Sequence, residues 1–169
     1  MARPQPGEFP PPFERYTSLV DVDNITDAVN KYAGDLVSFY TSLPEEKADY
    51  AYAPGKWTLK EVLQHVIDAE RVFSYRMMCI ARKDTTPLPS FDENSYADNA
   101  LASQRTFASL KEEFVATRKS TDLLLQSLNI DQLSSMGISG KYPASANSLG
   151  YVIFGHLMHH KNVTEERYL

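Results

Sequence analysis

Four long segments of this 169-residue chain repeat their apolar residues with the 3.6-residue period of an α-helix. The pattern predicts helices over about residues 23–43, 58–82, 102–128 and 148–169. No segment shows the alternation and hairpin turns that predict paired strands. Four helices of this length are enough for a four-helix bundle, so we expect an all-α protein with up-down-up-down topology. In that topology the second and fourth helices run parallel.

The start of the second helix is the most clearly marked boundary. Thr58 and Glu61 form a T-x-x-E capping box just after the turn at Pro54 and Gly55, and Pro44 ends the first helical segment. A long connection with two prolines follows the second helix over residues 83–100, and such a loop is typically functional or covers an end of the fold. Residues 129–148 predict a short helical turn and a polar loop.

Length and a 43% hydrophobic content fit one globular domain, which we place over residues 21–169. Residues 1–20 contain several prolines and no apolar core of a secretory signal. They predict an extended arm with polyproline character that lies on the domain or serves a partner chain.

Composition argues against several classes of protein. The net charge is −5 and no dense stripe of Lys and Arg occurs, so we expect no nucleic-acid partner. No run of about 18 apolar residues occurs, which argues against a membrane span. The single cysteine, Cys79, excludes an internal disulfide and fits a reducing compartment. We therefore expect a cytoplasmic protein.

The four histidines are the residues most informative about function. At 100° per residue, His156 and His160 lie about 40° apart near the middle of the apolar face of the last helix, and His159 lies on its flank at about −60° from His156. His65 lies on the apolar face of the second helix. Three imidazoles that point into one apolar core need partners for their ring nitrogens, and a divalent cation supplies them.

We therefore predict a mononuclear metal site with His65, His156 and His160 as ligands. Three protein ligands leave a fourth position open, which is typical of a catalytic rather than a structural zinc site. Leu157 stands where the H-E-x-x-H motif of zinc proteases needs Glu, and no histidine has Glu three residues before it, as di-iron bundles require.

Three motifs carry a family resemblance: W-T-L-K-E-V-L-Q-H after the Pro-Gly turn, D-A-E-R-V-F-S-Y-R followed by F-D-E-N-S-Y, and G-H-L-M-H-H-K-N-V-x-x-E-R-Y-L at the end. Together they resemble the DinB-like family, which includes YfiT-type metal-dependent hydrolases. The resemblance implies a four-helix bundle with one divalent metal ion, commonly zinc or nickel. It implies the same ligands, His65, His156 and His160, with His159 outside the coordination sphere.

The resemblance also implies two activities on a small molecule. One is a thiol S-transferase that joins a low-molecular-weight thiol to an electrophile, and the other is a hydrolase. From its direction on the second helix, about −60° from His65, Asp68 is a candidate base for hydrolysis or an acid that faces solvent or a neighbouring helix. The alternative is a non-enzymatic, stress-associated bundle in which the metal ties two helices together. A homodimer is also implied, with Tyr151, Phe154, Leu157 and Met158 as a candidate surface or as residues packed inside the bundle.

The expected topology leads to one spatial prediction. If the second and fourth helices are parallel, Arg76 and Arg167 share the end of the bundle covered by Phe91, Asp92 and Glu93. Access to the metal then comes from the other end, where Tyr52, Trp57 and Tyr142 are candidate lining residues.

Overall fold

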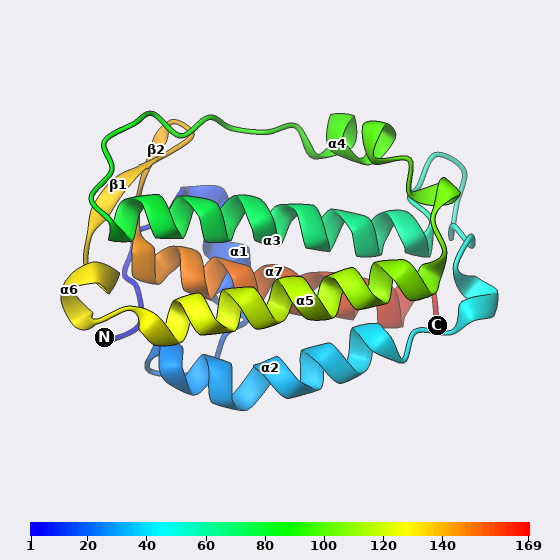
Figure 1. Cartoon of the computed structure of the whole chain (residues 1–169), viewed down its shortest axis with the longest axis horizontal. Helices are drawn as coiled ribbons and strands as arrows, with labels where there is room; N and C mark the ends of the chain where they lie inside the picture. Colours follow the sequence, from blue (N-terminus) through cyan, green and yellow to red (C-terminus); the bar gives the residue numbers. More distant parts are fainter.

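The computed structural model describes residues 1–169, and four long helices that pack side by side form its body (Figure 1). These helices are α2 (Ile25–Thr41), α3 (Leu59–Ala81), α5 (Phe107–Ser127) and α7 (Ala146–Arg167). The shorter elements are η1 (Pro11–Phe13), α1 (Glu14–Thr17), η2 (Glu45–Lys47), α4 (Glu93–Ala100), η3 (Ala102–Gln104), α6 (Ile130–Leu133), β1 (Met136–Ser139) and β2 (Tyr142–Ser145). The predicted four-helix bundle is confirmed, and none of its helices combines the length and apolar character needed to span a bilayer.

The helices do not alternate in direction as expected. The hydroxyl of Tyr168, at the end of α7, donates a 2.7 Å hydrogen bond to the carbonyl of Trp57, just before α3 begins. Helices α3 and α7 are therefore antiparallel. Two contacts relate α3 to α5. Gln64, near the start of α3, accepts a 2.9 Å hydrogen bond from Arg105, just before α5, and Glu70, further along α3, pairs with Arg118 in α5. These two contacts run in the same sequence order, so α3 and α5 are parallel.

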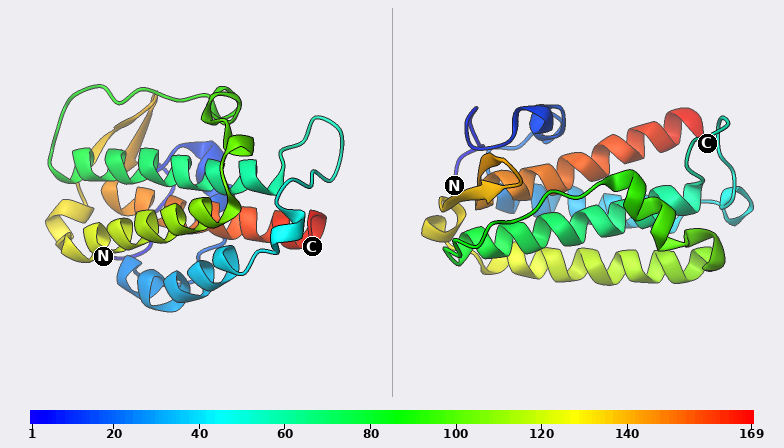
Figure 2. Two further views of the ribbon diagram at one scale, coloured as in Figure 1. Left: turned by 45° about the vertical axis from the view of Figure 1, so that its right-hand side comes forward. Right: turned by 90° about the horizontal axis from the view of Figure 1, so that it is seen from above.

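The physical reason lies in the connection between α3 and α5. Seen from above in Figure 2, it returns along the whole length of α3, so that α5 starts at the same end as α3. Helix α4 lies within this return. The order is therefore up-down-down-up, and the predicted up-down-up-down alternation is wrong. A short loop would have forced an antiparallel neighbour, but a segment of this length does not.

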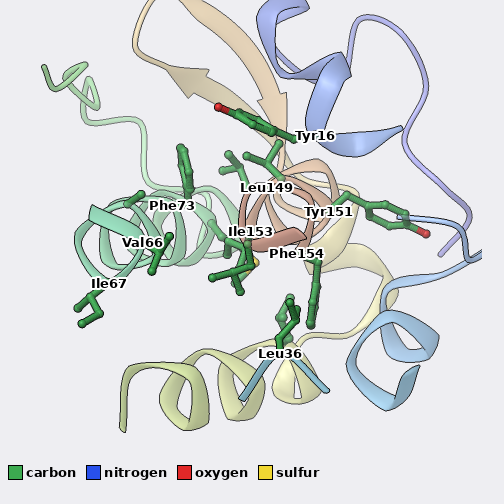
Figure 3. Packing of buried hydrophobic residues seen from close by; sticks show 14 of the residues in the cluster. Tyr16, Leu36, Val66, Ile67, Phe73, Leu149, Tyr151, Ile153 and Phe154 are labelled. Carbon is green, nitrogen blue, oxygen red and sulfur yellow. The ribbon is translucent and has the colours of Figure 1, made fainter. Parts of the chain in front are cut away.

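Helix α7 is the central element of the core. All residues of its first half, 146–157, are buried. Side chains of α2, α3 and α7 meet around Ile153 and Phe154 (Figure 3). The hydroxyl of Tyr40 in α2 donates a 2.8 Å hydrogen bond to the carbonyl of Leu157. A helix that is apolar on nearly all sides needs neighbours on nearly all sides, which α1, α2, α3 and α5 provide.

This burial corrects the predicted dimer surface. Tyr151, Phe154 and Leu157 are at most 1% exposed. The Tyr151 hydroxyl donates to the carbonyl of Val22, and the Phe154 ring lies 6.4 Å from that of Tyr32. These side chains belong to the interior because α2 and the segment before it cover that side of α7.

One ion pair crosses the core between α3 and α5. The Arg118 guanidinium is fully buried, and its Nη1 lies 2.8 Å from Oε1 of Glu70, which is also buried. Arg118 pairs with Asp122 as well and lies over the ring of Phe154. Burial raises the pKa of Glu70, while the neighbouring guanidinium opposes that shift.

The first 20 residues pack against the bundle. Arg3 donates a 2.7 Å hydrogen bond to the carbonyl of Thr17, and Asn147 of α7 donates one of 2.9 Å to the carbonyl of Ala2. Pro10 has polyproline-like backbone angles, but the next residues form η1 and α1 instead of a continuous extended arm. The arm therefore forms one wall over α7.

The region 129–148 contains a hairpin that the sequence pattern did not predict. Strands β1 and β2 pair antiparallel, with Ser139 opposite Tyr142. The two residues between them are Gly140, with φ of 65°, and Lys141. Glycine as the first of two turn residues is typical of a tight hairpin, so the sequence S-G-K-Y is consistent with this turn. The predicted short helical turn is present as α6.

Candidate metal centre

The start of α3 determines where His65 lies. The Thr58 hydroxyl accepts the amide hydrogen bond of Glu61, and the Glu61 carboxylate accepts that of Thr58, so the predicted capping box is formed. Because the helix begins at a definite residue, His65 lies two turns inside it with its ring turned toward α7. It is 8% exposed.

The structure brings His65 together with His156 and His160, as predicted from their helical directions. The Nε2 atoms of His65 and His156 are 3.1 Å apart. One ligand nitrogen from each of the three rings lies within 4.8 Å of the other two. His156 and His160 are one turn apart on α7, and their ring centroids are separated by 4.5 Å.

These distances fit a single metal ion. Two nitrogens that bind zinc at 2.0–2.1 Å with tetrahedral angles lie about 3.3 Å apart. The His65–His156 separation of 3.1 Å is already close to that value, and a nitrogen of His160 lies within 4.8 Å of both. Apart from the contact between His65 and His156, the three rings form no hydrogen bonds. A cation between them satisfies three ring nitrogens at once.

Burial keeps these imidazoles neutral. Desolvation lowers the pKa of His65 to about 4, against an opposing effect of the Glu93 charge. Desolvation also lowers the pKa values of His156 and His160 well below the ordinary range, and the neighbouring histidines add to the shift. Neutral imidazole is the form that binds metals, so the site is prepared for a cation at neutral pH.

His159 lies outside the trio, as expected. It is half-buried, and its ring packs at 5.5 Å from the ring of Tyr16 in α1. Tyr16 also contacts His156, with 5.2 Å between ring centroids. His159 therefore lines the approach to the histidines beside the N-terminal arm.

The three histidines open onto a cavity of about 660 Å³. Its apolar walls come from aromatic side chains. The ring centroids of Trp57 and His65 are 4.7 Å apart with a tilt of 39°, and those of Phe73 and His156 are 5.7 Å apart. The N-terminal arm contributes Tyr16, and the hairpin contributes Tyr142. The cavity is of the size that takes a small organic molecule.

The cavity does not open at the predicted end of the bundle. Arg76 and Phe91 line the same cavity as Trp57, so it extends along the flank of α3 instead of entering from one end. Arg167 ends α7, beside the start of α3, whereas Arg76 lies in the second half of α3. Arg167 is exposed there and pairs with Glu166. Both differences follow from the antiparallel arrangement of α3 and α7. Tyr52 does not line the cavity; it packs against Tyr168.

The structure also replaces the candidate base. Asp68 accepts a 3.0 Å hydrogen bond from Gln64 and faces the polar contacts between α3 and α5, away from the cavity. Glu93, the first residue of α4, is the carboxylate that lines the cavity. Glu93 was expected over one end of the bundle and not in this cavity, because the path of the long connection along α3 has no signature in the sequence.

Comparison with known proteins identifies the family of this chain and finds solved structures with a similar fold. A family model described as the DinB superfamily matches residues 32–163. YfiT from Bacillus subtilis, a probable metal-dependent hydrolase with an unusual four-helix bundle topology, is similar in structure, with a TM-score of 0.69 and 16% identity over 96% of this chain and 89% of that chain.

A second similar structure is the mycothiol-dependent maleylpyruvate isomerase, with a TM-score of 0.64 and 14% identity. The similarity covers 89% of this chain and 60% of the isomerase, and a mutant of the isomerase matches equally well. At these identities the likeness concerns the fold. No curated protein matches the sequence. Because the family model spans most of the chain, the protein belongs to the DinB superfamily.

Proposed function

We propose that the protein is a metalloenzyme in which His65, His156 and His160 hold one divalent ion, zinc or nickel, and that it acts as a thiol S-transferase on a small molecule. The observation that carries the proposal is the group of three neutral imidazoles at the wall of a 660 Å³ cavity. The mycothiol dependence of a protein with the same fold supports a thiol as one substrate.

When bound, an ion with three histidine ligands offers an open coordination position and lowers the pKa of a thiol placed there. The residues of the chain then have two tasks. His65 on α3 and the two histidines on α7 hold the site between two rigid helices. Trp57, Phe73 and Tyr16 exclude water from one side of it, which favours a desolvated nucleophile.

Hydrolysis is the second candidate, and a specific residue favours it. Glu93 lines the same cavity as the three histidines, and its charge opposes the lowering of the His65 pKa by burial. A carboxylate there accepts a proton from an attacking water. The Glu93→Gln variant separates the two activities, because it removes this base and leaves a thiol nucleophile able to react.

The test uses purified protein loaded with zinc or nickel and a panel of low-molecular-weight thiols with an aromatic chloride as electrophile. We expect conjugation that falls at least a hundredfold in His65→Ala and by less than about threefold in His159→Ala. His159 is the matched control because it lines the same cavity outside the trio. If the metal is retained and neither conjugation nor ester hydrolysis responds to His65→Ala, a non-enzymatic bundle tied by the metal is the better account.

Homodimer formation and a cytoplasmic location remain predictions from the family resemblance and the composition. Of the four residues named for the dimer surface, only Met158 is not buried within the chain, so the outer side of α7 offers little apolar surface for a dimer.

A further inference from the structure

Arg76 is a buried cation without an anionic partner. It lies on α3, is 6% exposed and forms no ion pair. Its guanidinium donates one hydrogen bond, to the carbonyl of Pro89, and lies 5.8 Å from the centroid of the Phe91 ring. Most of its five N–H donors are therefore unused, although a buried charge ordinarily needs a partner.

The arginine lines the same cavity as the histidines, at a distance from them. Eleven residues separate His65 from Arg76 on α3, which corresponds to about 16 Å along the helix axis. Phe73 lies between them, on the wall of the cavity. A molecule with one end at the histidines and the other at Arg76 would therefore be elongated, with an apolar middle.

A second polar group without a partner lies at the Arg76 end. Ser139, the last residue of β1, is 4% exposed, and its hydroxyl forms no hydrogen bond. Ser139 forms an isolated β-bridge with Leu88 in the connection between α3 and α4. The carbonyl of the next residue, Pro89, accepts the hydrogen bond of Arg76. Ser139 is the one cavity-lining residue among those with a buried, unpaired side-chain atom.

The charges around the cavity favour an anion. Arg15, Arg76 and Lys141 line it, against one carboxylate, Glu93. Glu93 forms no ion pair with any of the three cations, so it neutralises none of them by direct contact. The lining therefore carries a net positive charge, and Arg76 has no anionic partner within it.

We propose that Arg76 and Ser139 form a carboxylate-binding subsite, and that the substrate is an elongated organic anion whose reacting group lies at the three histidines. The placement of the reacting group at the histidines rests on the proposed function, whereas the subsite at Arg76 and Ser139 does not depend on it. A planar guanidinium binds a carboxylate through two parallel hydrogen bonds, and a serine hydroxyl adds a third donor. Lys141 and Arg15, at the more exposed rim, guide the anion inward.

The test compares two thiols of equal length, mercaptohexanoate and mercaptohexanol, titrated calorimetrically into the zinc-loaded protein. We expect the wild type to bind the carboxylate at least about tenfold more tightly than the alcohol. Arg76→Gln should abolish this preference and leave the affinity for mercaptohexanol unchanged, and Ser139→Ala should reduce the preference about threefold. Arg82→Gln is the matched control, because Arg82 ends the same helix and is exposed.

The wild type binding both thiols equally would overturn the proposal, as would a preference that survives in both Arg76→Gln and Ser139→Ala. Thermal unfolding checks that the variants fold. If Arg76→Gln does not fold, the carboxylate preference of Ser139→Ala alone tests the subsite. Hexanoate titrated into the metal-free protein tests the subsite without the metal. If hexanoate binding depends on Arg76 while His65→Ala leaves mercaptohexanol affinity unchanged, the subsite stands and the proposed metal function fails.

Discussion

A Cβ atom on Gly155 would lie 2.0 Å from the backbone carbonyl oxygen of Tyr16. The N-terminal arm thus contacts α7 backbone to backbone, at the residue before His156. This contact places the Tyr16 ring against His156 and makes the arm a wall of the cavity. Only glycine fits at this position, because a Cβ atom would overlap the backbone of Tyr16, which cannot move as a flexible side chain would.

We therefore predict that Gly155→Ala displaces the arm. The added methyl group should lower the free energy of unfolding by about 1–3 kcal/mol and make residues 1–20 sensitive to limited proteolysis. Gly34→Ala in α2 is the control, because its Cβ would meet no atom within 4 Å, and alanine there should be neutral or stabilising. An arm that stays protected in Gly155→Ala would show that the close approach is not what holds it.

The buried pair of Glu70 and Arg118 provides a prediction about stability. Glu70→Ala leaves the Arg118 guanidinium buried with Asp122 as its remaining partner, so the free energy of unfolding should fall by about 3–5 kcal/mol. Arg71→Ala removes an ion pair with Glu113 on the exposed side of the same helix and should cost less than about 1 kcal/mol. Urea unfolding of both variants measures the difference. Equal losses would mean that burial does not decide the contribution of these pairs.

The metal-free protein should lose stability as the pH falls from 7 to 5. The pKa of His65 is about 4 in the folded state and near 6.5 in the unfolded chain. Below pH 6.5 the unfolded chain therefore binds a proton that the folded protein does not, and its stability declines until the pH reaches about 4. For His65 alone the loss between pH 7 and pH 5 is about 2 kcal/mol.

His65→Gln is neutral at both pH values, so its stability should depend less steeply on pH than that of the wild type. Urea titrations of the metal-free proteins at the two pH values give the comparison. The same slope in both proteins would contradict a depressed pKa at His65.

Helix positions and the histidine trio could be predicted because both depend on local geometry. The 3.6-residue period located α3 and α7 to within about two residues, and the same rotation per residue separated His159 from His156 and His160. The capping box at Thr58 determined the start of α3. None of these inferences needed to know how the helices are connected.

The parts that could not be predicted depend on the path of the chain between helices. Residues 82–106 contain no pattern that says whether they turn back or run the length of the bundle. The path of this segment determines the direction of α5, the placement of Arg76 and Arg167, and the presence of Glu93 in the same cavity as His65. The contact between Gly155 and Tyr16 is likewise tertiary, since a glycine inside an apolar helix does not indicate which segment packs against it.

Bound metal should stabilise the fold, because it joins α3 to α7. At a free zinc concentration about a thousandfold above the dissociation constant, the expected gain is about 4 kcal/mol, or a rise in Tm on the order of 10 °C. Treatment with a chelator should reverse the shift. A Tm that is the same with and without zinc would mean that the three histidines bind no ion in the folded state.

The most direct test of the central claim is the metal content of the purified protein after zinc loading and gel filtration. We predict one ion per chain in the wild type and in His159→Ala, and much less than one in His65→Ala, His156→Ala and His160→Ala, each confirmed to be folded. A wild type that retains no ion, or a His65→Ala protein that retains one ion per chain, would contradict the assignment of these three histidines as a metal site.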